Sequence, residues 1–239
     1  LTDFPTTWTP ERLPGLVAWF SAGRNYVAID GSPDVLSWRS RHTDGQLLAS
    51  TGLSAPDWLP NGWGSGIGAL GCDGNNAMTL GASALLTAGI GTDVPFSVFC
   101  TIQPTAEAER VILCWQTAVP TESTLRIIDN GGGLFIINYH RVDDASGVAN
   151  VTGTHAVGVA KCRIGVLFAG TSAQIYLNGA LEASGACNVG ALTPDTFKLG
   201  SGPGIGDGFT GLFPDAVILN REASVAEYMA YYNWSMRTP

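Results

Sequence analysis

A short hairpin signal in the last third of the chain constrains the fold more than any other feature. Asn178-Gly179 lies between two runs of strand-forming residues, 174–177 and 180–183. A two-residue type I′ turn needs a positive φ at both central positions, and Asn followed by Gly adopts that conformation at low steric cost. The pair therefore predicts a β-hairpin with Tyr176 opposite Leu181 and Ile175 opposite Glu182. We expect Tyr176 and Leu181 to share a covered face of the sheet.

Similar strand and turn signals recur along most of the chain. Strand-like runs at 16–20, 95–103, 111–116, 125–128, 134–139, 163–168 and 209–219 are separated by turn residues at roughly the 8–12-residue spacing of sandwich strands. The polar segment 104–110 predicts a hairpin between two of these runs, and Asp129 to Gly133 predicts another. The chain has 31 Gly and 13 Pro, and only 13% of its residues are charged, which is typical of a turn-rich β protein. We therefore predict an all-β fold, a two-sheet antiparallel β-sandwich.

The C-terminus is predicted to be helical. Ser224 and Glu227 form a capping box, in which each side chain satisfies a backbone N–H at the start of a helix. The expected apolar stripe that packs this short helix on the sandwich comprises Val225, Tyr228, Met229, Tyr232 and Met236.

The chain is expected to form one domain. Residues 1–13 carry several prolines and threonines and are expected to form an irregular N-terminal arm. Residues 14–239 show no internal repeat and no linker, although the part from 35 to 80 reads as loop-rich.

Five stretches, taken in order, resemble landmarks of the laminin-G-like, or concanavalin A-like lectin and glucanase, jelly-roll superfamily. They are P-G-L-V-A-W-F-S-A at 14–22, V-L-S-W-R-S at 35–40, D-G-N-N-A-M-T-L at 73–80, the I-Y-L-N-G hairpin at 175–179, and the closing strand and helix from 209 to 234. The resemblance implies a concanavalin A-like jelly roll of the kind found in bacterial surface proteins and bacteriophage structural proteins. It implies a non-catalytic recognition or display module.

Glycoside hydrolases are the enzymes that share this fold, and they need paired acidic residues on one strand. Retaining chemistry requires the two carboxyl groups to lie about 5–5.5 Å apart. The two-apart pair Glu107 and Glu109 lies in the polar segment 104–110, so we expect a solvated loop rather than a catalytic pair. The glycines at 66–71 match a dinucleotide fingerprint but lack its strand-to-helix context. The prediction is that the chain is not an enzyme.

Two kinds of candidate site follow. The loop aromatics Trp58, Trp63 and Tyr26 are candidates for stacking on sugar rings, with core or loop anchoring as the alternative. Calcium is the cofactor that the resemblance allows, since some laminin-G-like relatives bind it through loop oxygens, which suit a hard cation. The candidate ligands are Asp73, Asn75, Asp129, Asn130, Asp143 and Asp144, all of which also favour ordinary turns.

The net charge limits the kinds of partner that we expect, and the cysteine spacing limits the expected state of the thiols. A formal net charge of -8 argues against nucleic acid, and no apolar run reaches the roughly 20 residues needed to insert into a membrane. The five cysteines lack a C-x-x-C spacing, so we expect reduced core thiols, with one disulfide as the alternative.

The expected role combines display and recognition. The first hypothesis is a structural decoration, fibre or appendage knob at a virion or cell surface, with the protein surface of a particle or envelope, or a glycan, as partner. A secreted carbohydrate-binding lectin domain is the alternative, and a glycoside hydrolase is the third. The expected location is the virion surface or the extracellular space, with a homo-oligomer as one assembly state.

Overall fold

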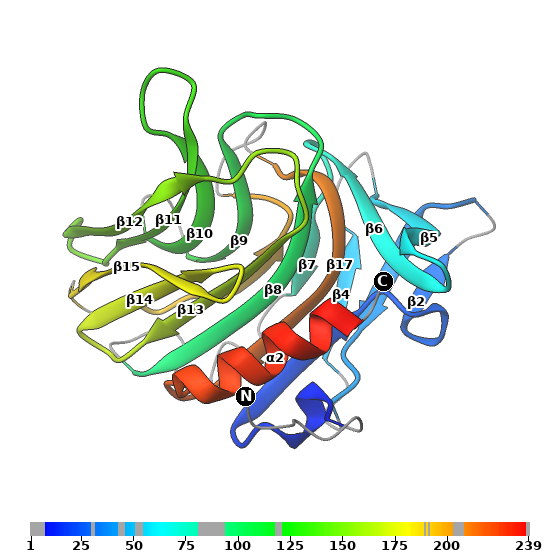
Figure 1. Ribbon diagram of the computed structural model, residues 1–239, viewed down its shortest axis with the longest axis horizontal. Helices are drawn as coiled ribbons and strands as arrows, with labels where there is room; N and C mark the ends of the chain where they lie inside the picture. Colours follow the sequence, from blue (N-terminus) through cyan, green and yellow to red (C-terminus); the bar gives the residue numbers. More distant parts are fainter. Residues whose placement is uncertain are drawn as a thin grey trace.

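The computed structural model describes residues 8–29, 32–42, 46–50, 55–80, 94–117, 121–188, 190, 192–202 and 208–237. Two antiparallel sheets pack face to face, and one helix near the C-terminus lies on the outer face of the first sheet (Figure 1). The predicted two-sheet antiparallel sandwich with a C-terminal helix is therefore confirmed.

Sheet A carries the helix and holds the first and last strands of the chain side by side. Strand β1 pairs with β17, and the other strands follow the order β15-β14-β13-β8-β17-β6-β5. The bounds are β1 Leu16–Ser21, β5 Asp57–Gly64, β6 Ile67–Asp73, β8 Phe96–Pro104, β13 Cys162–Phe168, β14 Ser172–Leu177, β15 Ala180–Ala186 and β17 Thr210–Leu219.

Sheet B forms the opposite layer in the order β12-β11-β10-β9-β16-β7-β4-β3-β2. Its strands are β2 Val27–Ile29, β3 Val35–Arg39, β4 Leu47–Ser50, β7 Met78–Leu80, β9 Arg110–Gln116, β10 Glu122–Asp129, β11 Phe135–Val142, β12 Val148–Ala156 and β16 Thr196–Leu199. Two 3-10 turns, Pro10–Arg12 and Arg24–Tyr26, flank β1.

The main core fills the space between the sheets. Phe96 is fully buried there and contacts the buried rings of Trp115, Tyr139 and Phe168 in tilted or edge-on geometry, while buried Trp38 contacts Phe20 and Phe213. Such rings bury large apolar areas in preferred edge or offset geometries, so they dominate the stability of a sandwich core. This layer holds the two sheets at a fixed distance.

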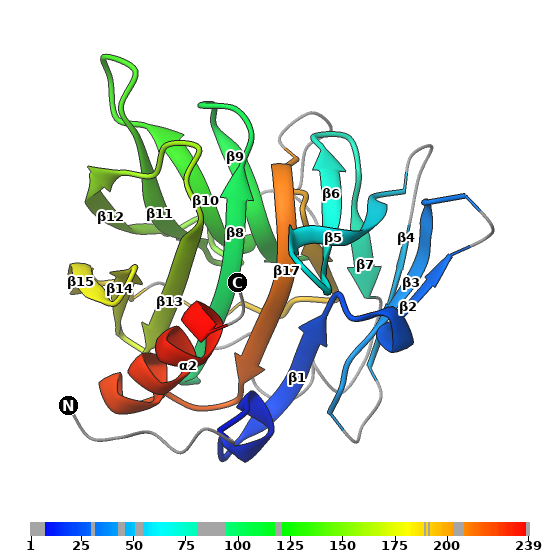
Figure 2. The same cartoon turned by 45° about the vertical axis from the view of Figure 1, so that its right-hand side comes forward.

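A second, smaller core lies under helix α2 (Val225–Arg237), which crosses the outer face of sheet A (Figure 2). The predicted capping box is present, since the Glu227 N–H donates to Ser224 Oγ and the Ser224 N–H donates to Glu227 Oε2. Tyr228 and Tyr231 are the helix residues that pack on Phe99 of β8. Within the described residues no helix is long and apolar enough to cross a membrane.

The predicted helix stripe is wrong at both ends. Val225 and Met236 are exposed, whereas Tyr231, which the stripe omits, is completely buried. The Tyr231 side chain faces inward because its hydroxyl forms hydrogen bonds with Asp215 and Thr101 beneath the helix. The hydrogen-bond partners beneath the helix therefore decide which of its faces is buried, and that face differs from the one predicted by the apolar stripe.

The Asn178-Gly179 turn is confirmed, with φ of 50° and 87° at the two residues. Tyr176 does pair with Leu181, but a bulge places Ile175 opposite Ala183, so the predicted pairing of Ile175 with Glu182 is wrong. Tyr176 is 5% exposed and Leu181 is 53% exposed, so they do not share a covered face.

The bulge has a visible cause in the next sheet. The Glu182 carboxylate accepts hydrogen bonds from the backbone N–H groups of Thr154 and His155 on β12, and from His155 Nδ1. The side chain thus joins the edge of sheet A to the edge of sheet B, where β12 and β15 lie side by side (Figure 1). This contact between distant parts of the sequence displaces Glu182 from the local register.

Two further expectations about strand order need correction. The runs at 95–103 and 111–116 do not form a hairpin, because β8 lies in sheet A and β9 in sheet B. Both strands are buried on both faces, so each takes a central place in its own sheet. The segment 35–80 is also richer in strands than expected, since it contains β3 to β7.

All five cysteines are buried free thiols, as the sequence predicts. Burial raises the pKa of Cys72 and of Cys114 to about 12, and that of Cys162 to about 11. These thiols therefore stay protonated and unreactive at neutral pH.

Candidate functional site

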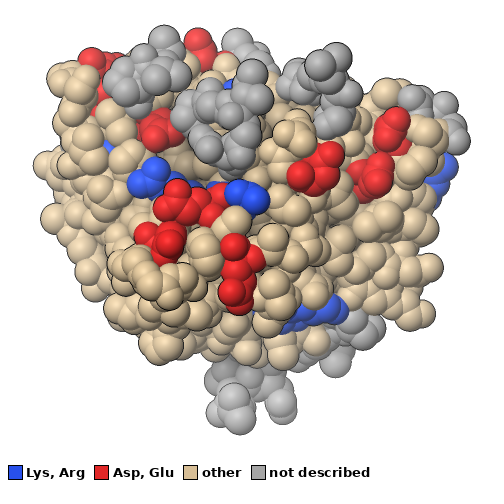
Figure 3. Space-filling model, turned by 90° about the horizontal axis from the view of Figure 1, so that it is seen from above, with Lys and Arg blue, Asp and Glu red and all other residues tan. Residues whose placement is uncertain are grey.

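The end of the sandwich that lies uppermost in Figure 1 carries the clearest polar surface. The β8–β9 and β10–β11 connections meet there, and Figure 3 shows acidic side chains with a few basic ones among them on a largely uncharged surface. A hydrogen bond from Arg110 Nε to Thr210 Oγ1, 3.2 Å long, joins the starts of β9 and β17 at this end.

A cleft of about 300 Å³ opens at this end between the start of β9 and the end of β10. We call it the end cleft; its lining residues are Glu109, Arg110, Val111, Arg126, Ile127, Ile128 and Asp129. A bulge positions it, because Leu125 pairs with Leu113 while the next residue, Arg126, pairs with Val111. A bulge bends its strand and increases the local twist, which re-aims the side chains beyond it.

Arg126 is the anchored cation of the end cleft. Its Nε donates to Asn138 Oδ1 at 2.8 Å, and Asn138 Nδ2 donates in turn to Thr152 Oγ1 at 2.8 Å. The two terminal nitrogens of Arg126 have no partner among the described residues. A guanidinium held by one edge presents its other donors in a fixed fork.

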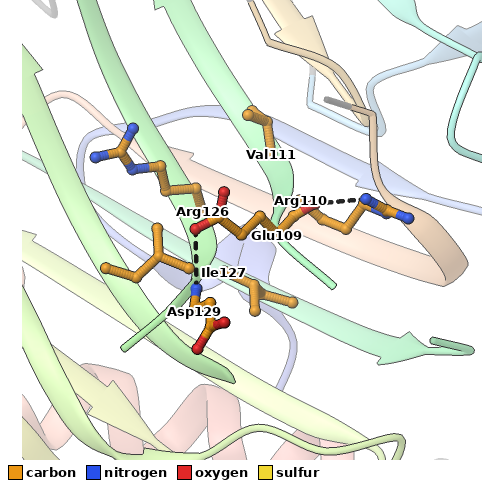
Figure 4. Close-up of a pocket in the computed structure, with 7 residues that line it drawn as sticks. Glu109, Arg110, Val111, Arg126, Ile127 and Asp129 are labelled. Carbon is orange, nitrogen blue, oxygen red and sulfur yellow. Dashed lines mark hydrogen bonds between the residues drawn. The ribbon is translucent and has the colours of Figure 1, made fainter. Parts of the chain in front are cut away.

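Two carboxylates stand beside it as acceptors. Glu109 Oε1 accepts from the Asp129 N–H at 3.1 Å, and Asp129 Oδ1 accepts from the Gly131 N–H at 2.8 Å. Figure 4 shows the Glu109 carboxylate between the Arg126 side chain and the Asp129 backbone, with Arg110 extending away. Glu109 Oε2 and Asp129 Oδ2 have no partner among the described residues, so the residues that line the cleft carry unused acceptors as well as unused donors.

The predicted aromatic residues lie elsewhere, near the end of α2. Trp58 is half-buried, its indole N–H donates to the Ala22 carbonyl at 3.0 Å, and the Arg24 guanidinium lies over its ring. Trp63 is 2% exposed and lines a second cleft of about 190 Å³ together with Arg41, Asp215 and Trp234. We call this the aromatic cleft.

Tyr26 lies beside that cleft without lining it. The ring is half-buried and carries the Arg41 guanidinium 4.9 Å above it. The structure therefore brings Tyr26 and Trp63 into one neighbourhood through Arg41, while Trp58 anchors a strand. Sugar stacking on these three residues stays a prediction.

The calcium candidates form three separate turns. Asp129 ends β10 opposite Phe135, the first residue of β11, while Asp143 follows the last residue of that eight-residue strand, so the two lie roughly 26 Å apart at strand spacing. Asp73 accepts from the Asn75 N–H at 2.8 Å, an ordinary turn contact. Within the described residues no group of three or more His, Cys, Asp or Glu side chains could hold a metal ion. Calcium binding by Asp73, Asn75, Asp129, Asn130, Asp143 or Asp144 stays a prediction.

Asp143 already has a structural task. Its Oδ1 accepts from the N–H groups of Ala145 and Gly147, and its Oδ2 accepts from the Gly190 N–H at 2.5 Å. Hydrogen bonds from the Gly147 and Gly190 backbone lower the pKa of Asp143, against its partial desolvation. The carboxylate thus joins the β11–β12 turn to a segment that lies far along the chain.

The acidic pair considered for catalysis lies in a loop, as expected. Glu107 and Glu109 are both exposed in the β8–β9 connection. On sheet B, Glu122 instead forms an ion pair with His140 at 3.2 Å and accepts from Thr124 at 2.9 Å. Burial disfavours the ionised form of Glu122, but the hydrogen bonds from His140 and Thr124 outweigh it and lower the pKa. Both Glu122 oxygens are occupied, so they are held as acceptors.

Comparison with known proteins places the chain among β-sandwich domains of similar architecture. The sequence matches no protein-family model and no curated protein. Domain 4 of AbnA, a GH43 extracellular arabinanase from Geobacillus stearothermophilus solved with arabinotriose, is 13% identical, with a TM-score of 0.63 over 89% of this chain and 96% of that chain.

Two toxin binding domains are similar to this chain over about half of their own length. The botulinum neurotoxin serotype G binding domain is 13% identical, with a TM-score of 0.67 over 93% of this chain and 52% of that chain. The binding domain of botulinum neurotoxin DC in complex with SialylT is 10% identical, with a TM-score of 0.64 over 92% of this chain and 51% of that chain. The chain thus spans about half the length of these toxin domains. These likenesses show the sandwich fold, while membership of the laminin-G-like family stays a prediction.

Proposed function

We propose that this chain is a non-catalytic carbohydrate-recognition module that binds glycan through the end cleft. The observation that carries the proposal is that Arg126, Glu109 and Asp129, each with an unused donor or acceptor among the described residues, line one cleft together with the aliphatic residues Val111 and Ile128.

The chemistry of sugars matches that arrangement. Each hydroxyl both donates and accepts, so a cleft lined by a guanidinium and by carboxylates can bond several hydroxyls of one sugar chain. The C–H faces of a sugar ring are apolar and fit the aliphatic wall. Binding sites of this kind combine a few fixed polar groups with an apolar lining.

The comparisons support the proposal at the level of the fold. The arabinanase domain was solved with a bound trisaccharide, and the chain covers 96% of it. A toxin binding domain of the same architecture was solved in complex with SialylT. The paired, open carboxylates of a glycosidase are not part of the proposal, because Glu109 lies in a loop and both Glu122 oxygens are occupied.

A glycan array that includes arabino-oligosaccharides tests the proposal, followed by calorimetry on the best ligand. We expect Arg126→Ala and Glu109→Gln to lower affinity at least tenfold, about 1.4 kcal/mol. The matched control is Glu107→Gln, an exposed change in the same loop that does not line the cleft. Binding to no glycan, or equal losses in Glu107→Gln and Glu109→Gln, would contradict the assignment.

We also propose that the module is displayed on a virion or cell surface as a decoration, fibre or appendage knob. The low charge content supports this role, since 13% of the residues are charged and Figure 3 shows the charged side chains scattered on a largely uncharged face. Mass spectrometry of purified particles from the source would find the chain at a fixed stoichiometry. Its recovery only from the culture medium would favour the secreted lectin.

A further inference from the structure

The aromatic cleft has no role in the function proposed above, yet its walls are chemically specific. Ser21 ends β1 and Gly23 follows it, Trp63 lies near the end of β5, Asp215 belongs to β17 and Trp234 lies near the end of α2. The cleft holds about 190 Å³, which is roughly the volume of six water molecules in the liquid. That space suits one sugar ring.

The cation on its wall is held rigidly. The Arg41 guanidinium lies 3.9 Å above the Trp19 ring and 4.9 Å above the Tyr26 ring. Its ion-pair partner among the described residues is Glu11, at a long 3.9 Å. Stacking between two rings fixes the guanidinium plane before any ligand arrives, which reduces the entropy lost on binding.

Buried polar atoms without partners gather around this cation, and they are all donors. Within the part of the chain that the structure describes, Arg41 Nε, Trp19 Nε1 and Arg163 Nε are buried and have no hydrogen-bond acceptor. Trp19 contacts both Arg41 and Trp234, while Arg163, 8% exposed, lies 5.9 Å from the Trp63 ring. An unsatisfied buried donor is costly, and Arg41 is the one of these three residues that lines the cleft, so an occupant that brings an acceptor is favoured there.

The charged side chains around the cleft also favour an occupant that carries acceptors. Four cationic side chains lie over aromatic rings that line the cleft or lie beside it: Arg24, Arg41, Lys161 and Arg163. They are four of the 12 Lys and Arg residues in a chain whose net charge is -8. Lys161 is also fixed by donating to the Trp63 carbonyl at 2.6 Å. Among the described residues, Asp215 is the carboxylate that lines the cleft and Glu11 lies 3.9 Å from Arg41, so these four cations outnumber the two carboxylates.

We propose that the aromatic cleft binds a carboxylate-bearing sugar residue, with its carboxylate on Arg41 and its ring against Trp234. The inference rests on the proposed glycan recognition and gives it a second, acidic subsite. Trp63 and Trp234 both line the cleft, but Trp63 is 2% exposed whereas Trp234 is half-buried, so Trp234 is the ring that a sugar can reach. Asp215, which also lines the cleft, is the group that limits affinity for an anion.

Matched ligands test the carboxylate directly. Glucuronic acid and glucose differ only in that group, and inorganic phosphate is an anion without a ring. We expect glucuronic acid to shift the indole N–H resonances of Trp19 and Trp234 in a two-dimensional NMR titration, and to bind at least tenfold more tightly than glucose. Equal binding of the two sugars, or phosphate binding as tightly as glucuronic acid, would overturn the proposal.

Matched variants test the residues. Arg41→Gln is expected to weaken glucuronic acid at least tenfold, while Arg39→Gln, an exposed change on the same strand segment, leaves affinity within twofold. Asp215→Asn is expected to strengthen binding, a gain that a folding defect cannot produce. An Arg41→Gln variant that keeps full affinity, or an Asp215→Asn variant that loses it, would refute the assignment.

The same titrations separate this inference from the proposed function. Arg126→Ala should leave the glucuronic acid shifts unchanged, because the end cleft is formed by β9 and β10. Array binding that depends on Arg126, without any response to glucuronic acid, would overturn the acidic subsite alone. A response to glucuronic acid without Arg126-dependent glycan binding would overturn the end cleft alone.

Discussion

Asp215 is a buried carboxyl group whose ionisation should lower the stability of the fold. It is 7% exposed on β17, and its Oδ1 accepts hydrogen bonds from the hydroxyls of Tyr231 and Thr101. Burial raises its pKa from 3.8 to about 6, although hydrogen bonds from Tyr231 and Thr101 and the charge of Arg163 lower it in part. The native state therefore prefers the protonated form.

The magnitude follows from the size of the shift. The pKa rises by about 2 units, from 3.8 to about 6, and each unit is worth 1.36 kcal/mol, so the total is about 3 kcal/mol. Since the folded-state pKa is raised, this stability is fully present below pH 3.8 and is lost as the pH rises through 6. Above that range the folded protein must hold a charged carboxylate in a dry site.

Asp215→Asn removes the titration while keeping an oxygen that accepts from Tyr231. The variant should unfold in urea with a free energy up to about 3 kcal/mol above the wild type at pH 8, and with a similar free energy at pH 4. Tryptophan fluorescence at several pH values measures the difference, and the other titrating groups cancel because both proteins share them. Tyr231→Phe should destabilise more at pH 8 than at pH 4. A variant no more stable than the wild type at pH 8, or a gain independent of pH, would refute the reasoning.

Three further outcomes follow from packing and capping. Gly165→Ala should cost about 1–3 kcal/mol in urea unfolding, because a Cβ there would lie 2.5 Å from the Tyr228 ring; Gly185→Ala, with its nearest contact at 3.6 Å, is the control and should change little. The five buried thiols should react with a thiol reagent such as DTNB only after unfolding, and a thiol titrated in the native state would contradict their burial. Ser224→Ala should lower stability by about 1 kcal/mol by removing the helix cap, and Ser201→Ala, outside the helix, should not.

Local chemistry predicted the turns and the helix cap, because these features depend on neighbours in the sequence. Asn178-Gly179 and the Ser224 to Glu227 box both form as expected. The register one step beyond the turn was not predictable, because Glu182 bonds to β12, a strand far away in the sequence. Likewise β8 and β9 are both apolar on both faces, so alternation cannot tell that they enter different sheets.

The candidate clefts were harder to predict than the fold. Glu109 reads as a solvated loop residue, and its place beside Arg126 depends on a bulge that has no sequence signature. The alternation of Glu122, Thr124 and Arg126 along β10 is the signal that points to a polar outer face. Trp63 was identified as a candidate, but its partner Trp234 reaches the cleft only because the terminal helix folds back over sheet A.

Asp215 takes part both in the stability of the fold and in the proposed ligand site. On one side its oxygen holds Tyr231 of the helix, and on the other side the residue lines the aromatic cleft. A carboxylate that lowers stability at neutral pH persists more readily where it serves a site, since strained and charged groups gather where function needs them. If Asp215→Asn both stabilises the fold and tightens glucuronic acid binding, the native carboxylate lowers the affinity of the cleft as well as the free energy of unfolding. If it stabilises the fold but leaves binding unchanged, Asp215 serves the packing of the helix and the cleft recognises its ligand through Arg41 alone.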